Sequence, residues 1–145
     1  MRQVKVVTNE TCGLRCRFCD ARSDHERNSI AGADALRKRL DLVPHDAGEL
    51  VLSGGEPTRR GDLPRVVAYA RAHTRARIVL ETNAAELTRT LAHELAAAGL
   101  DRARVHLPAW GDDLDRVCRH DGTGIAVRNG IAMPSLSFRV RAASP

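Results

Sequence analysis

Residues 3–19 of this 145-residue chain read QVKVVTNETCGLRCRFC and bring three cysteines into one short segment. The alternating apolar residues at the start of the segment predict a strand over residues 3–8. Cys12, Cys16 and Cys19 follow it, with three residues and then two residues between them. Cysteine thiolates are the usual ligands of iron–sulfur clusters, and three are one fewer than a cubane cluster normally takes. The spacing therefore predicts a metal centre that keeps one coordination position open for chemistry.

The three cysteines alone also suit a zinc site. His25 or Cys118 would supply a fourth ligand and close a tetrahedral shell of three cysteines and one histidine, or of four cysteines. Zinc sites usually draw their ligands from two separate pairs, whereas here three cysteines crowd a single loop. The spacing therefore favours a cluster, and zinc stays open as the alternative.

A Gly-Gly-Glu-Pro sequence follows the second predicted strand. Residues 49–53 (ELVLS) have the composition of a short buried strand, and Gly54, Gly55, Glu56 and Pro57 come directly after it. Glycines let a ligand approach the backbone because they carry no Cβ. Their carbonyl oxygens and a carboxylate can accept charge-assisted hydrogen bonds from an ammonium group, and proline stops the strand. A plain turn is the competing interpretation, because these residue types are common in turns.

Strand-like and helix-like segments alternate along the chain. Further strands are predicted over 77–82, 103–107 and 136–141, helices over 33–43, 62–73 and 86–98, and a weakly helical stretch over 112–132. Repeated strand–helix units imply right-handed crossovers and a parallel sheet. Five strands are too few for a closed eight-stranded barrel. The sequence therefore predicts an α/β fold, an open TIM-like β/α barrel of about five parallel strands with helices outside, as one domain over residues 1–145.

Composition and charge narrow the range of partners. Lysine and arginine number 23 against 18 acidic residues, and nearly all of this positive charge is arginine spread along the chain. The four aromatic residues are scattered, so the sequence offers no base-stacking platform and argues against nucleic-acid binding. No apolar stretch approaches the roughly 20 residues of a membrane span, and the N-terminus shows no signal peptide. We therefore expect a cytoplasmic protein whose reduced cysteines serve metal or redox chemistry.

Together, the two motifs resemble the radical SAM (S-adenosylmethionine) superfamily. The signature of that family is Cys-x3-Cys-x-aromatic-Cys, and here Phe18 supplies the aromatic residue before Cys19. A Gly-Gly-Glu-Pro motif follows the second strand in the family, as it does in this chain. Residues 81–83 (ETN) resemble the end of the family's third strand, and residues 105–107 (VHL) resemble its fourth. The resemblance extends over residues 3–142.

The resemblance implies two cofactors. Cys12, Cys16 and Cys19 would ligate three irons of a [4Fe-4S] cluster, and the fourth iron would bind the amino and carboxylate groups of SAM. One electron would then cleave SAM to methionine and a 5′-deoxyadenosyl radical, which takes a hydrogen atom from a substrate. That substrate would be a small molecule, a peptide or a protein, and a low-potential donor such as flavodoxin or ferredoxin would supply the electron.

The resemblance also implies which residues contact SAM. The ammonium would be held by Gly54, Gly55 and Glu56 with Pro57 beside them, the adenine would lie near Phe18, and the ribose or carboxylate near Thr82, Asn83 and His106.

The chain departs from the family on its C-terminal side. The family's core has six strand–helix units, whereas this chain stops shortly after the fifth predicted strand. Three interpretations follow. The chain is a compact enzyme whose open side is covered by a partner subunit or a second copy, an inactive fragment of a longer enzyme, or a protein that binds the cluster and SAM without efficient turnover. The alternative function is a metal-binding module that holds zinc or an iron–sulfur cluster without catalysis.

Overall fold

The computed structural model describes residues 1–17, 19, 32–132 and 138–142. In chain order the elements are β1 (Gln3–Val7), α1 (Ala33–Asp41), β2 (Glu49–Ser53), the short 3-10 helix η2 (Pro57–Arg59), α2 (Leu63–His73), β3 (Arg77–Thr82), α3 (Arg89–Ala97), β4 (Arg102–Leu107), α4 (Asp112–Cys118), α5 (Thr123–Ile131) and β5 (Phe138–Ala142).

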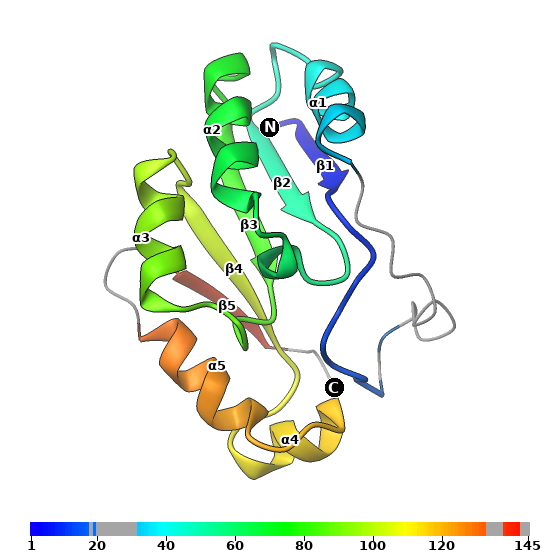
Figure 1. Cartoon of the computed structure of the whole chain (residues 1–145), viewed down its shortest axis with the longest axis vertical. Helices are drawn as coiled ribbons and strands as arrows, with labels where there is room; N and C mark the ends of the chain where they lie inside the picture. Colours follow the sequence, from blue (N-terminus) through cyan, green and yellow to red (C-terminus); the bar gives the residue numbers. More distant parts are fainter. Residues whose placement is uncertain (18, 20–31, 133–137, 143–145) are drawn as a thin grey trace.

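The strands form one parallel sheet in the order β1-β2-β3-β4-β5, so each strand pairs with the next along the chain. Helices α1, α2 and α3 lie side by side against one face of this sheet (Figure 1). The described strands run from β1 at one edge to β5 at the other. This arrangement is an open, partial β/α barrel with helices outside, which confirms the predicted fold class.

The core lies between the sheet and its helices. Strand side chains alternate between the two faces of a sheet, and the helix-facing residues Leu50, Leu52, Ile78 and Leu80 are fully buried. Burying large aliphatic side chains of this kind contributes about 1.5–3 kcal/mol each. The other face, on the inside of the barrel, carries charged residues at intervals, and it is this face that meets the candidate site.

The stretch over 112–132, predicted to be weakly helical, forms two helices. Arg119 adopts a left-handed conformation with φ of 52° and ends α4, and Gly122, with φ of 80°, precedes α5. The carboxylate of Asp115 accepts the backbone N–H of Gly122 at 2.8 Å and that of Gly124 at 2.6 Å. One acidic side chain therefore holds the corner between the two helices.

Side-chain contacts mark the starts of α3 and α2. Helix α3 begins later than predicted because the Thr88 hydroxyl accepts the backbone N–H of Leu91 at 3.1 Å. At the start of α2, Asp62 makes no capping hydrogen bond and instead accepts two from the Arg60 guanidinium, at 2.9 and 2.8 Å. The buried Arg60 also donates to the Thr8 carbonyl at 2.7 Å. This pair ties the end of β1 to the start of α2.

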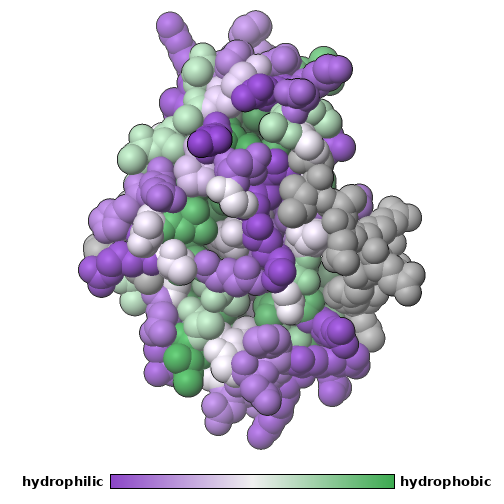
Figure 2. Space-filling model, in the orientation of Figure 1, coloured by the Kyte–Doolittle hydropathy of each residue, from purple (hydrophilic) through white to green (hydrophobic). Residues whose placement is uncertain are grey.

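The surface on the helix side is largely hydrophilic, with small apolar areas between the helices (Figure 2). Leu42, Ile125 and Trp110 are the most exposed large apolar side chains after Met1 among the described residues. Within the described part of the chain, every helix is too short or too polar to cross a membrane.

Candidate functional site

A cavity of about 360 Å³ opens at the carboxyl ends of the strands. This volume lies within the range of small-molecule sites. The residues predicted from the sequence that line the cavity are Cys12, Cys16, Cys19, Gly54, Gly55, Glu56, Thr82, Asn83 and His106. Pro57 is buried as the first residue of η2 and does not line the cavity, and Phe18 lies outside the described residues.

The cysteine segment follows β1 and crosses the mouth of the cavity. The Cys12 sulfur accepts the backbone N–H of Leu14 at 3.5 Å and lies 3.8 Å from the Asn83 side-chain nitrogen. Burial raises the pKa of the Cys12 thiol, although the Leu14 N–H opposes this effect. A thiolate at this position is therefore favoured when a metal compensates its charge. Within the described residues, no three cysteine, histidine or acidic side chains converge closely enough to hold a single metal ion.

Helix α4 braces the cysteine segment through its last two residues. The backbone N–H groups of Arg15 and Arg17 donate to the carbonyls of Cys118 and Val117 at 3.1 and 3.0 Å. The sulfurs of Cys16 and Cys118 are 3.2 Å apart. In this pair of thiols Cys16 donates the hydrogen bond, which raises the pKa of Cys16 and lowers the pKa of Cys118.

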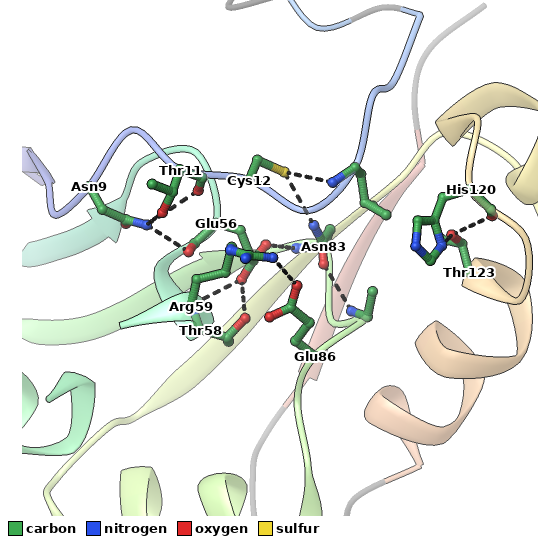
Figure 3. A network of polar contacts seen from close by, with 12 residues as sticks. Asn9, Thr11, Cys12, Glu56, Thr58, Arg59, Asn83, Glu86, His120 and Thr123 are labelled. Carbon is green, nitrogen blue, oxygen red and sulfur yellow. Dashed lines mark hydrogen bonds and ion pairs between the residues drawn. The ribbon is translucent and has the colours of Figure 1, made fainter. Parts of the chain in front are cut away.

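Glu56 joins the ends of β2 and β3. Its side chain is buried, and one carboxylate oxygen accepts the Thr58 N–H at 3.2 Å and the hydroxyls of Thr58 and Thr82, both at 2.6 Å. The other oxygen accepts the Asn83 N–H at 2.8 Å, as Figure 3 shows in part. Burial raises the pKa of Glu56, against the effect of these donors. A carboxylate offers about four acceptor positions, so this side chain serves mainly to hold the two loops together.

The two glycines of the turn are needed for close packing of the chain on itself. A Cβ on Gly54 would lie 2.3 Å from the Asn9 carbonyl oxygen, and one on Gly55 would lie 2.4 Å from that of Thr11. The turn is paired with the same segment, because the N–H groups of Gly55 and Glu56 donate to the Asn9 and Thr11 carbonyls at 2.9 and 2.7 Å. The Cβ side of both glycines therefore faces the chain rather than a ligand, and only their carbonyls remain candidates for ligand contact.

An ion pair closes over the cysteine segment from outside. Arg59, in η2, and Glu86, after β3, are 2.7 Å apart (Figure 3). Both reach Gly13, where an added Cβ would lie 2.6 Å from the Arg59 nitrogen and 2.7 Å from the Glu86 oxygen. The loops after β1, β2 and β3 thus meet at one point beside Cys12.

The wall of the cavity on the inner face of the sheet is a chain of ion pairs. Glu81 contacts Lys5 at 2.6 Å and Arg104 at 3.2 Å, and Arg104 contacts Glu49 at 2.7 Å. Gln3 also donates to Glu49 at 2.5 Å. Burial raises the pKa of Glu49, but the hydrogen bonds from Arg104 and Gln3 outweigh it, so the pKa is lowered overall.

Sequence reasoning missed this charged wall and the role of Cys118. The signal for the wall was present, because Glu49, Glu81 and Arg104 are charged residues within the predicted strands. No local pattern identifies the Cys118 contact, since 102 residues separate that cysteine from Cys16.

Known sequences similar to this chain include one family model and several curated proteins. The family model described as the radical SAM superfamily matches residues 6–132. A probable GTP 3′,8-cyclase of Thermoplasma volcanium is 33% identical over 116 residues, which are 76% of this chain and 34% of that protein. An Fe-coproporphyrin III synthase of Methanosarcina barkeri is 33% identical over 130 residues, which are 87% of this chain and 32% of that protein. The chain thus spans about a third of the length of these curated relatives.

Among solved structures, native anSMEcpe with bound AdoMet and a peptide matches with a TM-score of 0.76. The match covers 95% of this chain and 42% of that one at 18% identity, which shows a shared fold. The family model spans most of the chain, including the cysteine segment and the Gly-Gly-Glu-Pro turn. The chain therefore belongs to the radical SAM superfamily.

Proposed function

We propose that this chain is the core of a radical SAM enzyme that generates a 5′-deoxyadenosyl radical in the cavity at the carboxyl ends of the strands. The observation that carries the proposal is the convergence of two distant motifs. Cys12, Cys16 and Cys19 line the same cavity as Gly54, Gly55 and Glu56, although a long segment of chain separates the two groups.

The donor set fits the cluster that the superfamily uses. Three thiols on one segment are soft ligands of the kind that iron–sulfur clusters take. Bound there, a [4Fe-4S] cluster and SAM supply reductive cleavage of the sulfonium and hydrogen abstraction from the substrate. Cys12, Cys16 and Cys19 are the proposed iron ligands, and a metal would compensate the charge that burial disfavours at Cys12.

The chain's own polar groups are proposed to orient SAM beside the cluster. The carbonyls of Gly54 and Gly55 and the less occupied oxygen of Glu56 would accept from the ammonium, and Pro57 would fix the turn that carries them. Thr82, Asn83 and His106 would face the ribose or carboxylate, and Phe18 the adenine. The buried hydrogen bonds of Glu56 make this arrangement rigid before SAM arrives, which lowers the entropic cost of binding.

We further propose a polar substrate. The ion-paired side chains of Lys5, Glu81 and Arg104 line the cavity on the sheet side, where an apolar substrate would leave charged groups without solvent. Several relatives are named as GTP 3′,8-cyclases, so GTP is the first compound to test.

Residues 1–145 would form a single core domain, and a partner subunit, a second copy or further chain would cover the open side of the barrel. Flavodoxin or ferredoxin in the cytoplasm would supply the low-potential electron. The alternative is a metal-binding module, holding zinc or an inert cluster, without turnover.

Anaerobic reconstitution with iron and sulfide tests the proposal. The protein should become brown, hold about four irons and four sulfides, and convert SAM to 5′-deoxyadenosine when dithionite is added. Cys12→Ala and Cys19→Ala should each lose the cluster while retaining the helical circular dichroism of the wild type. A colourless protein that retains one tightly bound zinc through reconstitution would contradict the proposal and support the metal-binding module.

A further inference from the structure

We propose that the Cys118 thiol donates an S–H···S hydrogen bond to the iron-bound sulfur of Cys16, positions that ligand, and raises the reduction potential of the cluster. The inference rests on the proposed function, because it requires Cys16 to be an iron ligand. It assigns a role to the one cysteine that lies outside the Cys-x3-Cys-x2-Cys segment.

The contact is close and partly buried. The two sulfurs are 3.2 Å apart, Cys118 is 2% exposed, Cys16 is half-buried, and both residues line the cavity. A hydrogen bond partly shielded from water is electrostatically stronger than one at the surface, because the local dielectric constant is lower.

The backbone fixes the position of Cys118 relative to the cysteine segment. Cys118 is the last residue of α4, and its carbonyl accepts the Arg15 N–H at 3.1 Å. The Val117 carbonyl accepts the Arg17 N–H at 3.0 Å, so Cys16 lies between two anchored residues. The last carbonyls of a helix need partners of this kind. These two main-chain hydrogen bonds hold Cys16 and Cys118 next to each other, within reach of the sulfur contact.

Iron binding determines which sulfur donates. In the thiol form Cys16 donates to Cys118. Cysteine binds iron as a thiolate, so the three ligand cysteines lose their protons. Of the four cysteines in the chain, Cys118 then holds the remaining thiol proton. The same contact persists with Cys118 as the donor.

A donor at this sulfur favours the reduced cluster. Reduction adds one negative charge, part of which resides on the ligand sulfurs, and a hydrogen bond to a more negative acceptor is stronger. Hydrogen bonds to cluster sulfurs and partners beyond the ligands tune reduction potentials for this reason. Cys118 would thus ease electron transfer to the cluster without contacting the substrate.

Potentiometric titration of the reconstituted cluster, followed by electron paramagnetic resonance, tests the inference. Cys118→Ala should shift the midpoint potential downward, and Cys118→Ser, which keeps a donor, should shift it less. Ile125→Ala, a truncation of an exposed apolar side chain on α5 that does not line the cavity, is the control and should leave the potential unchanged. An unchanged potential in Cys118→Ala, or an equal shift in Ile125→Ala, would overturn the inference.

The wild-type protein provides a second test that needs no variant. With the cluster loaded, infrared spectroscopy should show a single S–H stretching band, shifted to lower frequency than that of a free thiol. An unshifted band would mean that Cys118 makes no hydrogen bond, and absence of the band would mean that Cys118 is itself a ligand or is oxidised; either result overturns the inference. Failure to load a cluster at all would instead contradict the proposed function.

Discussion

The carboxylate of Glu56 accepts the backbone N–H of Asn83 at 2.8 Å and thereby connects the carboxyl ends of β2 and β3. The other carboxylate oxygen accepts the backbone N–H of Thr58 at 3.2 Å. Each oxygen therefore satisfies a main-chain donor that cannot turn away, in a position that water does not reach. Glu56, the most buried acidic residue that lines the cavity, therefore links two loops that carry residues of the site.

Glu56→Gln should destabilise the protein because an amide offers only one acceptor oxygen, which leaves one of the two N–H groups unpaired. We expect a loss of about 1–3 kcal/mol in the free energy of unfolding, measured by urea denaturation at neutral pH. Glu94→Gln, on the exposed side of α3, is the control and should change stability by less than about 0.5 kcal/mol. Equal stability of the two variants would mean that Glu56 is protonated in the folded protein.

Gly55→Ala should disturb the cysteine segment from the opposite side of the turn. The new Cβ would lie 2.4 Å from the Thr11 carbonyl oxygen, which is main chain and cannot rotate away. Overpacking of this kind costs about 1–3 kcal/mol, and the displaced segment should also take up less iron during reconstitution. Gly61→Ala is the matched control, because no atom lies within 4 Å of its Cβ position. Normal iron content in Gly55→Ala would show that the segment tolerates the shift.

Arg104→Gln should raise the pKa of Glu49. In the wild type, burial raises that pKa but the hydrogen bond from Arg104 helps to lower it overall, so Glu49 stabilises the fold above its unfolded pKa and loses this effect as the pH falls. Without Arg104, the Gln3 hydrogen bond and the Arg77 charge remain to oppose the effect of burial, so the pKa of Glu49 rises. The variant should therefore be less stable than the wild type at neutral pH, with a gap that narrows towards acid.

Carbon-13 NMR titration of the Glu49 carboxyl, together with unfolding at several pH values, measures this effect. Arg116→Gln is the control, because its pair with Asp113 is exposed on α4. A stability gap between Arg104→Gln and wild type that widens towards acid would contradict the assignment.

Asp115→Ala should loosen the corner between α4 and α5. The hydrogen bonds from Gly124 and Gly122 lower the pKa of Asp115, so the carboxylate protects both amides until the pH falls through its folded value. In the variant, hydrogen exchange at the Gly124 amide should be faster at neutral pH and should lose its acid-dependent step. Asp112→Ala, on the same helix, provides the comparison. Wild-type exchange in Asp115→Ala would show that another group holds the corner.

The order of strands and helices could be predicted from the sequence because local patterns determine it. Buried runs such as residues 50–52 and 78–80 are bounded by turn residues, and the helices between them carry apolar stripes. The sequence also predicts that the two motifs lie close together, because the carboxyl ends of parallel strands meet at one edge of a sheet.

The chemistry inside the site could not be predicted in the same way, because it depends on contacts between distant segments. Glu56 finds Thr82 and Asn83 on the next strand, 26 and 27 residues away. Cys118 meets Cys16 only because α4 folds back beneath the cysteine segment. A motif identifies which residues gather at the site, but it does not show which of their atoms already form hydrogen bonds within the protein.

The hydrogen bonds between α4 and the cysteine segment can form only after α4 has been synthesised. A ribosome releases the N-terminal cysteines first, and 102 residues separate Cys16 from Cys118. At roughly 5–20 residues per second, the nascent chain carries unsupported thiols for about 5–20 seconds before α4 exists. Iron inserted during that interval would meet a segment without its scaffold. We therefore expect cluster delivery to follow the synthesis and folding of α4, with metal-free protein as the form that the iron–sulfur delivery machinery receives.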